Sequence, residues 1–427
     1  MVVLMSDEES SSEPVSPKVG KSALAFICIT ILIDTAGFGV IIPVFPKLLM
    51  ELTGEGLGTA ALYAGSLLTI YAVTQFFAAP VLGNLSDRFG RRPILVFSML
   101  AFSVDYIFMG FAPTVAFLFI GRFFAGILGA TFATANAFIA DISSEENRAR
   151  NFGYIGAAWG LGFIVGPMLG GLLGQYGPRL PFFVAAGIAF ANAVFGFFVL
   201  PESLPKENRR AFSFKRANPL GALIQIKKFP MLIGFFVIIL LNQLAHDVNP
   251  AVWSYYVIEK FNWSEAQIGY SLGWVGFMVI VVYGGLVGPV VKKIGERNAI
   301  YFGMIMLCIG YCGFGLSTEG WMLYAFTIPF ALGGLENTSI RSIMAGSVPA
   351  NMQGELQGAV SSVLSLTMIF SPMLMTGLFH HFTRDRELYP DATYFPGVSF
   401  VTAAAITVLS LLVYIIWCRR VAPAAAE

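Results

Sequence analysis

Charged side chains are scarce in this 427-residue sequence and make up 12% of it, whereas a soluble globular protein usually carries about 25%. The formal net charge is only +1, so the composition gives no indication of a nucleic-acid partner. The four cysteines do not suggest a disulfide framework, because three lie inside apolar stretches and the fourth at the end of one. The sequence contains no nucleotide-binding loop, metal-ligand cluster or nucleophile constellation. We therefore expect neither an enzyme nor a bound cofactor or resident metal.

Long apolar runs are abundant instead. Hydrophobic residues make up 56% of the chain, the mean hydropathy is +0.74, and runs long enough to cross a hydrocarbon core of ~30 Å recur along the whole length. Such spans must be helical, because lipid cannot satisfy open backbone groups. We predict an all-α membrane protein with twelve spanning helices, at residues 23–49, 60–83, 93–111, 114–140, 151–175, 181–200, 231–258, 266–290, 298–316, 320–345, 356–380 and 396–417.

The sequence contains an internal repeat. GNLSDRFGRRP at residues 83–93 is echoed by GPVVKKIGERN at residues 288–298, an offset of 205 (288 minus 83), and Pro167–Leu169 is echoed by Pro372–Leu374 at the same offset. Membrane proteins built from two such halves are commonly secondary transporters. We predict two pseudo-symmetric six-helix bundles, with the chain divided into a tail at 1–20, a first bundle at 21–200, a linker at 201–230, a second bundle at 231–418 and a tail at 419–427.

Lysine and arginine are distributed unevenly between the predicted loops. If both termini are cytoplasmic, 19 of the 26 Lys and Arg residues fall in cytoplasmic segments and five in outer loops. The positive-inside rule therefore predicts cytoplasmic termini. The linker 201–230 carries seven of these residues, which we interpret as topological anchors rather than a partner-binding site. Residues 1–20 form a Ser-rich, acidic segment that we expect to be disordered.

The turn at residues 83–93 combines small, rigid and acidic residues. Gly83 would let two helices approach closely, and Gly90 can adopt the positive φ that a tight reversal needs. Pro93 suits the first turn of the following helix. Asp87 is expected to accept hydrogen bonds at a helix N-terminus, where free N–H groups favour an anion.

The arginines of this turn, Arg88, Arg91 and Arg92, can pair with acids at the same membrane face, and Asp141 is the nearest candidate. Such a latch would hold the protein in one conformation until a ligand shifts the equilibrium. Alternatively, the arginines are only positive-inside anchors, although that interpretation explains neither Asp87 nor the glycine spacing.

The turn resembles the signature of the major facilitator superfamily between its second and third helices. Six further segments resemble one subgroup, the bacterial tetracycline/proton antiporters: VDY at 104–106, IGRFFAGILGA at 120–130, ADI at 140–142, GPMLGG at 166–171, PES at 201–203 and QGELQG at 353–358. The resemblance covers roughly residues 25–380 and is densest in the first half. It implies drug export from the cytoplasm driven by inward proton flow. Its tetracycline members carry the drug as a chelate of a divalent metal.

Glycines spaced four apart mark the fifth span. Gly162, Gly166 and Gly170 form one small-residue stripe, Pro167 interrupts the helix ladder beside it, and Gly171 completes GPMLGG. Small residues at this spacing let membrane helices pack closely and slide. The resemblance places this helix against the eighth, across the interface between the halves, and the GPMLGG motif resembles one that favours export. Static close packing is the alternative interpretation.

Three ionisable residues lie inside predicted spans of the first half: Asp34, Asp105 and Arg122. Charges within the bilayer are costly and are functional candidates by default. Asp34 lies ~16 Å deep, and Asp105 and Arg122 share a depth of ~10 Å, at about 1.5 Å per residue. Asp105 and Arg122 can form an ion pair, or Arg122 can tune the proton affinity of whichever carboxylate faces the cavity. The resemblance ties all three to coupling or substrate handling.

The second half departs from the pattern of this family. The segment 242–253 brings His246 and Asp247 into the seventh span, and the tenth span carries Glu336 and Arg341. His246 beside Asp247 is a candidate proton site, because histidine titrates near neutrality, unless both lie in water at an outer helix end. Glu336 either pairs with Arg341 or faces the cavity and alters substrate choice.

Candidate substrate-cavity residues are polar or aromatic side chains within the predicted spans. Gln75 matches a family position tied to coupling or substrate handling, and the aromatic residues can stack on a planar ligand. The full set is Tyr71, Gln75, Asn136, Phe163, Asn242, His246, Trp274 and Glu336.

The sequence thus favours a proton-coupled antiporter that exports a drug-like amphiphile, with a tetracycline-like molecule as the best single guess, by alternating access. We expect a multi-pass protein of the bacterial inner membrane that functions as a monomer and has protons, a small-molecule substrate and lipid as partners. A divalent metal is expected only as part of a chelated substrate. The alternatives are a proton symporter importing a sugar, nucleoside or organic acid, and a membrane sensor that transports nothing.

Overall fold

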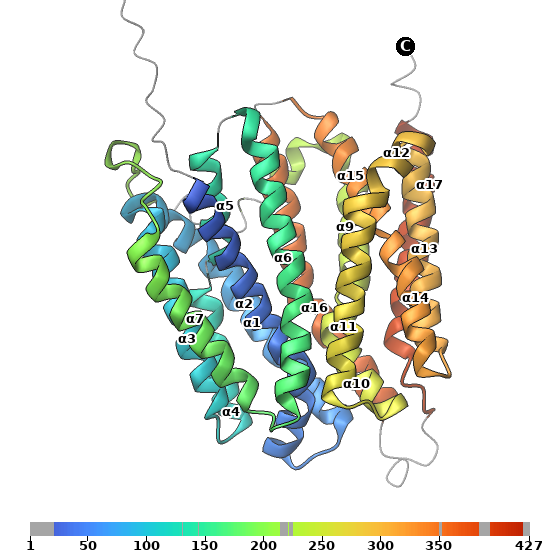
Figure 1. The fold of residues 1–427 in the computed structure, drawn as a ribbon. Helices are drawn as coiled ribbons and strands as arrows, with labels where there is room; N and C mark the ends of the chain where they lie inside the picture. The colour runs from blue at the N-terminus through green and yellow to red at the C-terminus, as the bar shows by residue number, and fades with distance from the viewer. Residues whose placement is uncertain are drawn as a thin grey trace, which may run out of the picture.

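The structure, a computed structural model, shows two helical bundles side by side (Figure 1). No strand occurs in the described residues, which are 21–129, 131–143, 145–213, 221, 225–349, 352–383 and 393–421. The predicted tail at 1–20 lies outside them, as does most of the tail at 419–427. The predicted fold class, an all-α membrane protein with two bundles, is confirmed.

The first half contains the helices α1 (Lys21–Thr53), α2 (Leu57–Phe89), α3 (Arg91–Gly110), α4 (Val115–Leu128), α5 (Thr131–Ile142), α6 (Glu145–Gly174) and α7 (Leu180–Val199). The second half contains α9 (Ile233–His246), α10 (Val248–Phe261), α11 (Glu265–Val281), the π-helical turn η4 (Val282–Leu286), α12 (Val287–Ile294), α13 (Glu296–Leu316), α14 (Gly320–Leu332), α15 (Gly334–Gly346), α16 (Gln353–Phe382) and α17 (Val398–Val421). Between the halves, the linker forms the short 3₁₀ turns η1 (Lys206–Asn208), η2 (Gln225–Lys228) and η3 (Pro230–Leu232).

Ten helical stretches in the described residues are long and apolar enough to cross a membrane. The other two predicted spans, 114–140 and 320–345, are each divided into two shorter helices, α4 with α5 and α14 with α15. Glycine marks each break, at Gly129 and at Gly333–Gly334, which agrees with its poor helix propensity. Two of the twelve predicted spans are therefore interrupted.

Two further irregularities lie in the second half. The seventh span changes from α9 to α10 at Asp247, and the eighth contains η4, where two glycines stand together in the sequence VYGGL. π-Turns and broken helices in membrane proteins are frequent at functional sites, because they free backbone groups and redirect side chains.

The two halves contact each other through α6 against α11 and α2 against α16. We name the side where α1 begins and α17 ends the terminal face, which is at the top of Figure 1, and the other side the opposite face. Near the opposite face, Ser254 donates to the Ile42 carbonyl at 2.9 Å and Lys47 pairs with Glu265 at 3.2 Å. These bonds join α10 and α11 to α1.

Toward the terminal face, the helices on the two sides of the interface between the halves are farther apart. A side chain added at Gly83 of α2, Gly156 of α6, Gly284 of η4 or Gly288 of α12 would have no atom within 4 Å. The expectation that Gly83 brings two helices into close contact was therefore wrong for this conformation. The halves are joined at the opposite face and diverge toward the terminal face.

Candidate functional site

The centre of the first half contains a buried ion pair. Arg122 of α4 donates through Nη2 to Asp105 Oδ2 of α3, and the two residues are 8% and 6% exposed. The same guanidinium lies 5.7 Å from the ring centroid of Tyr71, and Nη2 is 2.7 Å from Met109 Sδ. Of the two possibilities considered for Asp105 and Arg122, the structure shows the ion pair. A buried pair such as this is costly to break, because removing one partner leaves the other charge uncompensated.

The ion pair is not fully satisfied. Asp105 Oδ1 and Arg122 Nε are buried and have no hydrogen-bond partner among the described residues. Buried polar atoms without partners are rare in folded proteins and are costly to maintain. This pair therefore retains capacity for one further donor and one further acceptor.

Asp34 lies on α1, half-buried near this pair. Its charge acts electrostatically on Tyr71 of α2 and Tyr106 of α3, and so do the charges of Asp105 and Arg122. Asp34 makes no hydrogen bond or ion pair with another described residue. The structure therefore brings Asp34, Asp105 and Arg122 into one neighbourhood, with Asp34 unpaired.

Gln75 connects this neighbourhood to the break in the fourth span. Its Nε2 donates to Tyr71 Oη at 3.0 Å and to the carbonyl of Gly129 at 3.2 Å. Gly129 is the residue at which α4 ends, so the side chain of Gln75 satisfies a carbonyl that a continuous helix would have used. Gln75 and Tyr71, both predicted cavity residues, lie beside the buried charges.

The second half contains two buried carboxylates. Glu336, in the first turn of α15, is 4% exposed, and its Oε1 accepts from Asn242 Nδ2 at 2.6 Å. Asp247, between α9 and α10, is 7% exposed and accepts from Gln243 at 2.6 Å and from Ser371. Both carboxylates receive neutral donors, in contrast to the Asp105–Arg122 pair of the first half.

The structure decides between the alternatives given above for Glu336 and for His246. Arg341 donates to Asn337 Oδ1 at 2.8 Å and forms no ion pair with Glu336 within the described part of the chain. His246 lies at the end of α9, midway along the span, and not at an outer helix end. Its ring stacks on Phe330 with the centroids 5.5 Å apart.

The remaining cavity candidates are dispersed. Phe163 stacks on Trp159 of the same helix at 5.5 Å, and the Trp274 indole donates to the Tyr324 carbonyl at 3.0 Å. Asn136 is half-buried on α5 and forms no hydrogen bond with a described residue. The structure does not unite these three with either cluster of buried charge.

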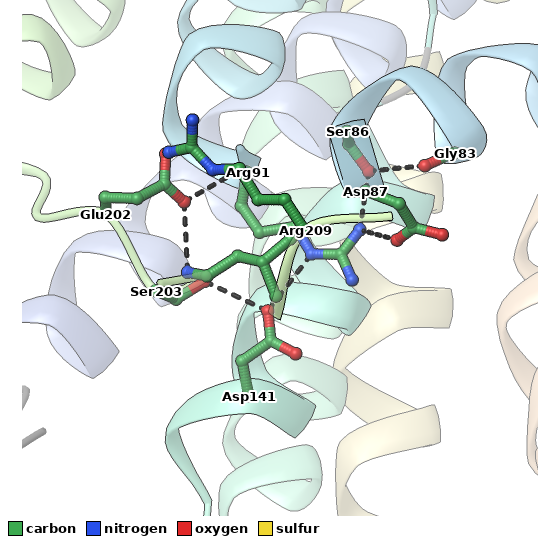
Figure 2. A network of polar contacts seen from close by, with 9 residues as sticks. Gly83, Ser86, Asp87, Arg91, Asp141, Glu202, Ser203 and Arg209 are labelled. Carbon is green, nitrogen blue, oxygen red and sulfur yellow. Dashed lines mark hydrogen bonds and ion pairs between the residues drawn. The ribbon is translucent and has the colours of Figure 1, made fainter. Parts of the chain in front are cut away.

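A second polar network lies at the terminal face (Figure 2). Arg91, the first residue of α3, contacts Asp141 Oδ2 through Nε at 3.0 Å and Asp87 Oδ1 through Nη1 at 2.6 Å. Its backbone N–H donates to Glu202 Oε1 at 2.8 Å. Ser203 donates to the same oxygen of Asp141 at 3.1 Å. Arg91 thereby joins α2, α3, α5 and the start of the linker.

The geometry of this turn confirms one expectation and corrects another. Gly90 has φ +109°, as its place in the reversal predicted. Asp87, however, lies in the last turn of α2 and not at a helix N-terminus. That position belongs to Glu202, whose carboxylate accepts from the first N–H of α3 and occupies the space above Gly90 that a side chain would fill.

The three arginines of the turn have different contacts. Only Arg91 pairs with Asp87 and Asp141. Arg92 donates to the Phe197 carbonyl, and Arg88 lies 5.1 Å from the centroid of the Phe89 ring. Among the described residues, the predicted latch therefore consists of one arginine and two carboxylates, and Arg88 and Arg92 form no ion pair with an acid there.

The sequence interpretation missed several members of this network, namely Ser86, Glu202, Ser203 and Arg209. The segment PES at 201–203 contains Glu202 and Ser203, but it was interpreted only as part of the resemblance to the antiporters and not as part of a polar network. Because the network lies within the first half and the linker, it does not cross to the second half in this conformation.

The glycine stripe of α6 packs differently from the prediction. A side chain at Gly162 would lie 2.5 Å from the carbonyl oxygen of Leu32, and one at Gly166 would collide with the backbone of Ala36, as close as 2.9 Å to its Cα. Both partners belong to α1, within the same half. The stripe itself therefore packs on α1 and not on the eighth span.

The contact with the eighth span uses the next residues of the same motif. A side chain at Gly171 would meet the backbone of Glu265 and lie 3.1 Å from Gly269 Cα, and one at Gly269 would lie 2.5 Å from the Pro167 carbonyl oxygen. The GPMLGG segment thus has small residues on two faces. One packs on α1 and the other on α11 across the interface between the halves.

Two bundles of membrane-crossing helices, each with buried ionisable side chains and interrupted helices, constitute the architecture of a secondary transporter. The chain belongs to the Major Facilitator Superfamily, whose family model matches residues 27–372 and 231–427. It is a multi-pass membrane protein of a transporter family and not an enzyme.

Tetracycline resistance proteins are among its relatives. The class C protein of Escherichia coli is 35% identical over 390 residues, which cover 91% of this chain and 96% of that protein. The class H protein of Pasteurella multocida is 32% identical over 95% of this chain and 99% of that protein. Multidrug resistance protein 2 of Bacillus subtilis (strain 168) is 29% identical over 84% of this chain and 89% of that protein.

Solved structures share the fold. The nucleoside transporter NupG superposes with a TM-score of 0.74 at 11% identity, covering 92% of this chain and 98% of that one. The human organic anion transporter MFSD10 (TETRAN) superposes with a TM-score of 0.68 at 20% identity, covering 94% of this chain and all of that one. At these identities the likeness concerns the fold alone.

Proposed function

We propose that this protein is a proton-coupled antiporter that exports a drug-like amphiphile, with a tetracycline-like molecule as the leading candidate. The observation that carries this proposal is the neighbourhood of Asp34 and the Asp105–Arg122 pair at the centre of the first half. An exchanger needs a buried carboxylate whose proton affinity depends on which side the cavity opens to. The tetracycline resistance proteins among the relatives support a drug of that class.

Sidedness follows from the charge distribution of the sequence. With 19 Lys and Arg residues assigned to one face and five to the other, the terminal face is cytoplasmic under the positive-inside rule. On this assignment the contacts Ser254–Ile42 and Lys47–Glu265 close the outer side, and the conformation is open to the cytoplasm. The protein would act as a monomer in the bacterial inner membrane, with energy from the proton gradient.

The cycle then assigns different tasks to the two networks. Substrate enters from the cytoplasmic side while the central carboxylates are ionised, or once a change of partner has released Asp105 from Arg122. Protons arriving from the outer side bind one of them after the halves have reversed. Arg91 with Asp87 and Asp141 holds the cytoplasmic ends of α2, α3 and α5 as one rigid unit during that movement. The small residues Gly171 and Gly269 let α6 and α11 move against each other.

The test is uptake by purified protein in liposomes with an imposed pH gradient, acid inside, and with tetracycline plus Mg²⁺ as the substrate. We expect accumulation that an uncoupler abolishes. Asp34→Asn or Asp105→Asn should abolish accumulation while allowing downhill equilibration of the substrate. Accumulation by both variants at the wild-type level would place the coupling site elsewhere, and substrate movement in the same direction as protons would establish symport instead.

A further inference from the structure

Glu336, a buried carboxylate of the second half, takes no part in the exchange proposed at Asp34, Asp105 and Arg122. Glu336 is 4% exposed and lies in the first turn of α15, just after the break that separates α14 from α15. The α13 helix packs closely over it, because a side chain at Gly303 would lie 2.6 Å from the Glu336 backbone nitrogen. This enclosure removes the carboxylate from bulk solvent.

The groups that face Glu336 are mostly neutral. Asn242 approaches from α9. The hydroxyl-bearing residues Tyr283 of η4 and Tyr311 of α13 lie close enough to interact electrostatically with the Glu336 carboxylate. The α14 helix contributes no charged residue. Arg341, five residues farther along α15, acts on Glu336 only over a distance and donates its own hydrogen bond to Asn337.

His246, the last residue of α9, lies 3.5 Å from Tyr311 Oη through its Nδ1. The charged residues of α12 and α13 lie at the terminal face. They are Lys292 and Lys293 at the end of α12 and Glu296 and Arg297 at the start of α13. Glu296 accepts a hydrogen bond from Ser342, which follows Glu336 by more than one helical turn. No cation lies within ion-pair distance of Glu336 in the described residues. An isolated ionised carboxylate is very costly in such surroundings, so it binds a proton or a cation.

Asn242 indicates which of the two is bound. Its Nδ2 donates to Glu336 Oε1 at 2.6 Å, while its Oδ1 is buried and has no hydrogen-bond partner among the described residues. An ionised carboxylate can only accept hydrogen bonds and so cannot satisfy this oxygen. A protonated carboxyl group carries an O–H donor. It can therefore form a two-point pair with the amide, with N–H donating to Oε1 and Oε2–H donating to Oδ1.

We propose that Glu336 is a second proton-binding site, in which Glu336 and Asn242 form a carboxylic acid–amide pair in this conformation. The proton sits on Oε2, and no other bond changes when it binds or leaves. The site is independent of the Asp105–Arg122 pair, whose carboxylate is compensated by a guanidinium in the other half. Transport of this proton rests on the proposed antiport, whereas its binding does not.

The surrounding helices provide a route for release. Glu336 follows the break at Gly333, and η4 places Tyr283 against Gly334, where an added side chain would collide with the tyrosine ring. Movement of α15 relative to α9 would separate Glu336 from Asn242 and expose the acid to water. An ionised carboxylate is then favoured, because water solvates its charge.

Infrared difference spectroscopy of the purified protein tests binding directly, by following the carboxylic acid C=O stretch as the pH is raised from neutral to strongly alkaline. We expect a protonated-carboxyl band at neutral pH that Glu336→Gln removes and Asn242→Leu shifts in position, since the amide hydrogen bond is lost. Glu355→Gln, at an exposed residue paired with Lys228, is the matched control and should leave the band unchanged. Persistence of the full band in Glu336→Gln, or an unshifted band in Asn242→Leu, overturns the proposal.

The ratio of protons to substrate tests transport separately. The ratio is obtained in liposomes from the pH gradient that exactly balances a known substrate gradient. We expect Glu336→Gln to lower the ratio by one proton per substrate. An unchanged ratio would refute a role in transport, even if the infrared band is lost. If the wild type shows no proton-coupled flux, the proposed antiport fails, while the infrared result still decides the binding site.

Discussion

Replacement of Arg122 by alanine is the sharpest perturbation of the first half. Arg122 and Asp105 are 8% and 6% exposed, and their ion pair is enclosed by Tyr71 and Met109. Removing one partner of a buried pair costs about 3–5 kcal/mol, because the remaining charge is left uncompensated. The lost packing of the long side chain on the Tyr71 ring adds to that cost. We therefore expect Arg122→Ala to lower the thermal unfolding temperature and to abolish proton-driven accumulation.

The double variant separates stability from coupling. In Arg122→Ala/Asp105→Asn no ionised group remains at the pair, so much of the lost stability should return, with a coupling energy of about 0.5–3 kcal/mol between the two sites. Proton-driven accumulation should stay absent, because the titratable carboxylate is gone as well. Arg92→Ala is the matched control. Its guanidinium contacts a carbonyl and an aromatic ring at the terminal face, so the expected change in unfolding temperature is small.

The measurements are the thermal unfolding of detergent-solubilised protein and substrate accumulation in liposomes with an imposed pH gradient. The reasoning is refuted if Arg122→Ala unfolds at the wild-type temperature and still accumulates substrate. It is refuted in part if the double variant is as unstable as the single one, because that result would assign the loss to packing and not to an uncompensated charge.

Three further substitutions test the terminal face and the glycine stripe. Asp87→Asn should change the stability by no more than about 1 kcal/mol, because its pair with Arg91 is partly exposed, and yet lower transport; normal flux would show that the turn is only an anchor. Glu202→Gln should retain acceptor hydrogen bonding to α3 but lose about 0.3–1 kcal/mol of charge–dipole stabilisation, measured by unfolding at low and high salt. Gly166→Leu should destabilise the protein by about 1–3 kcal/mol or more through overpacking against α1, whereas Gly156→Leu, which has free space around it, should not.

The repeat and the apolar runs were enough to predict the helices and the two bundles. Length and hydropathy define a membrane span without reference to its neighbours, so each spanning helix can be predicted from its own segment of sequence. The pairing of Asp105 with Arg122 was also accessible, because two opposite charges at equal depth in adjacent spans have few other partners. The breaks at Gly129 and Gly333 were not predicted, since glycine is common in continuous membrane helices and only the tertiary contacts distinguish a break.

The packing partners could not be derived from the sequence pattern. A stripe such as Gly162, Gly166 and Gly170 shows that something approaches closely, but not which helix it is. The side chain at the N-terminus of α3 was likewise misassigned. Asp87 is close to that terminus in sequence, whereas Glu202 reaches it from 111 residues away, and sequence proximity gave the wrong acceptor. Both errors concern contacts between distant segments, where several partners satisfy the same local pattern.

The two halves share a repeated backbone but distribute buried charge in different ways. The first half compensates Asp105 with Arg122, so its carboxylate can remain ionised within the membrane. The second half surrounds Glu336 and Asp247 with amides and hydroxyls, which can stabilise a neutral acid by hydrogen bonding but supply no positive charge. Proton binding at Asp105 therefore requires Arg122 to leave its partner, whereas a proton can bind at Glu336 or Asp247 without the displacement of a cation. The departure of the second half from the family pattern is therefore the part of this protein most suited to change how many protons accompany each substrate.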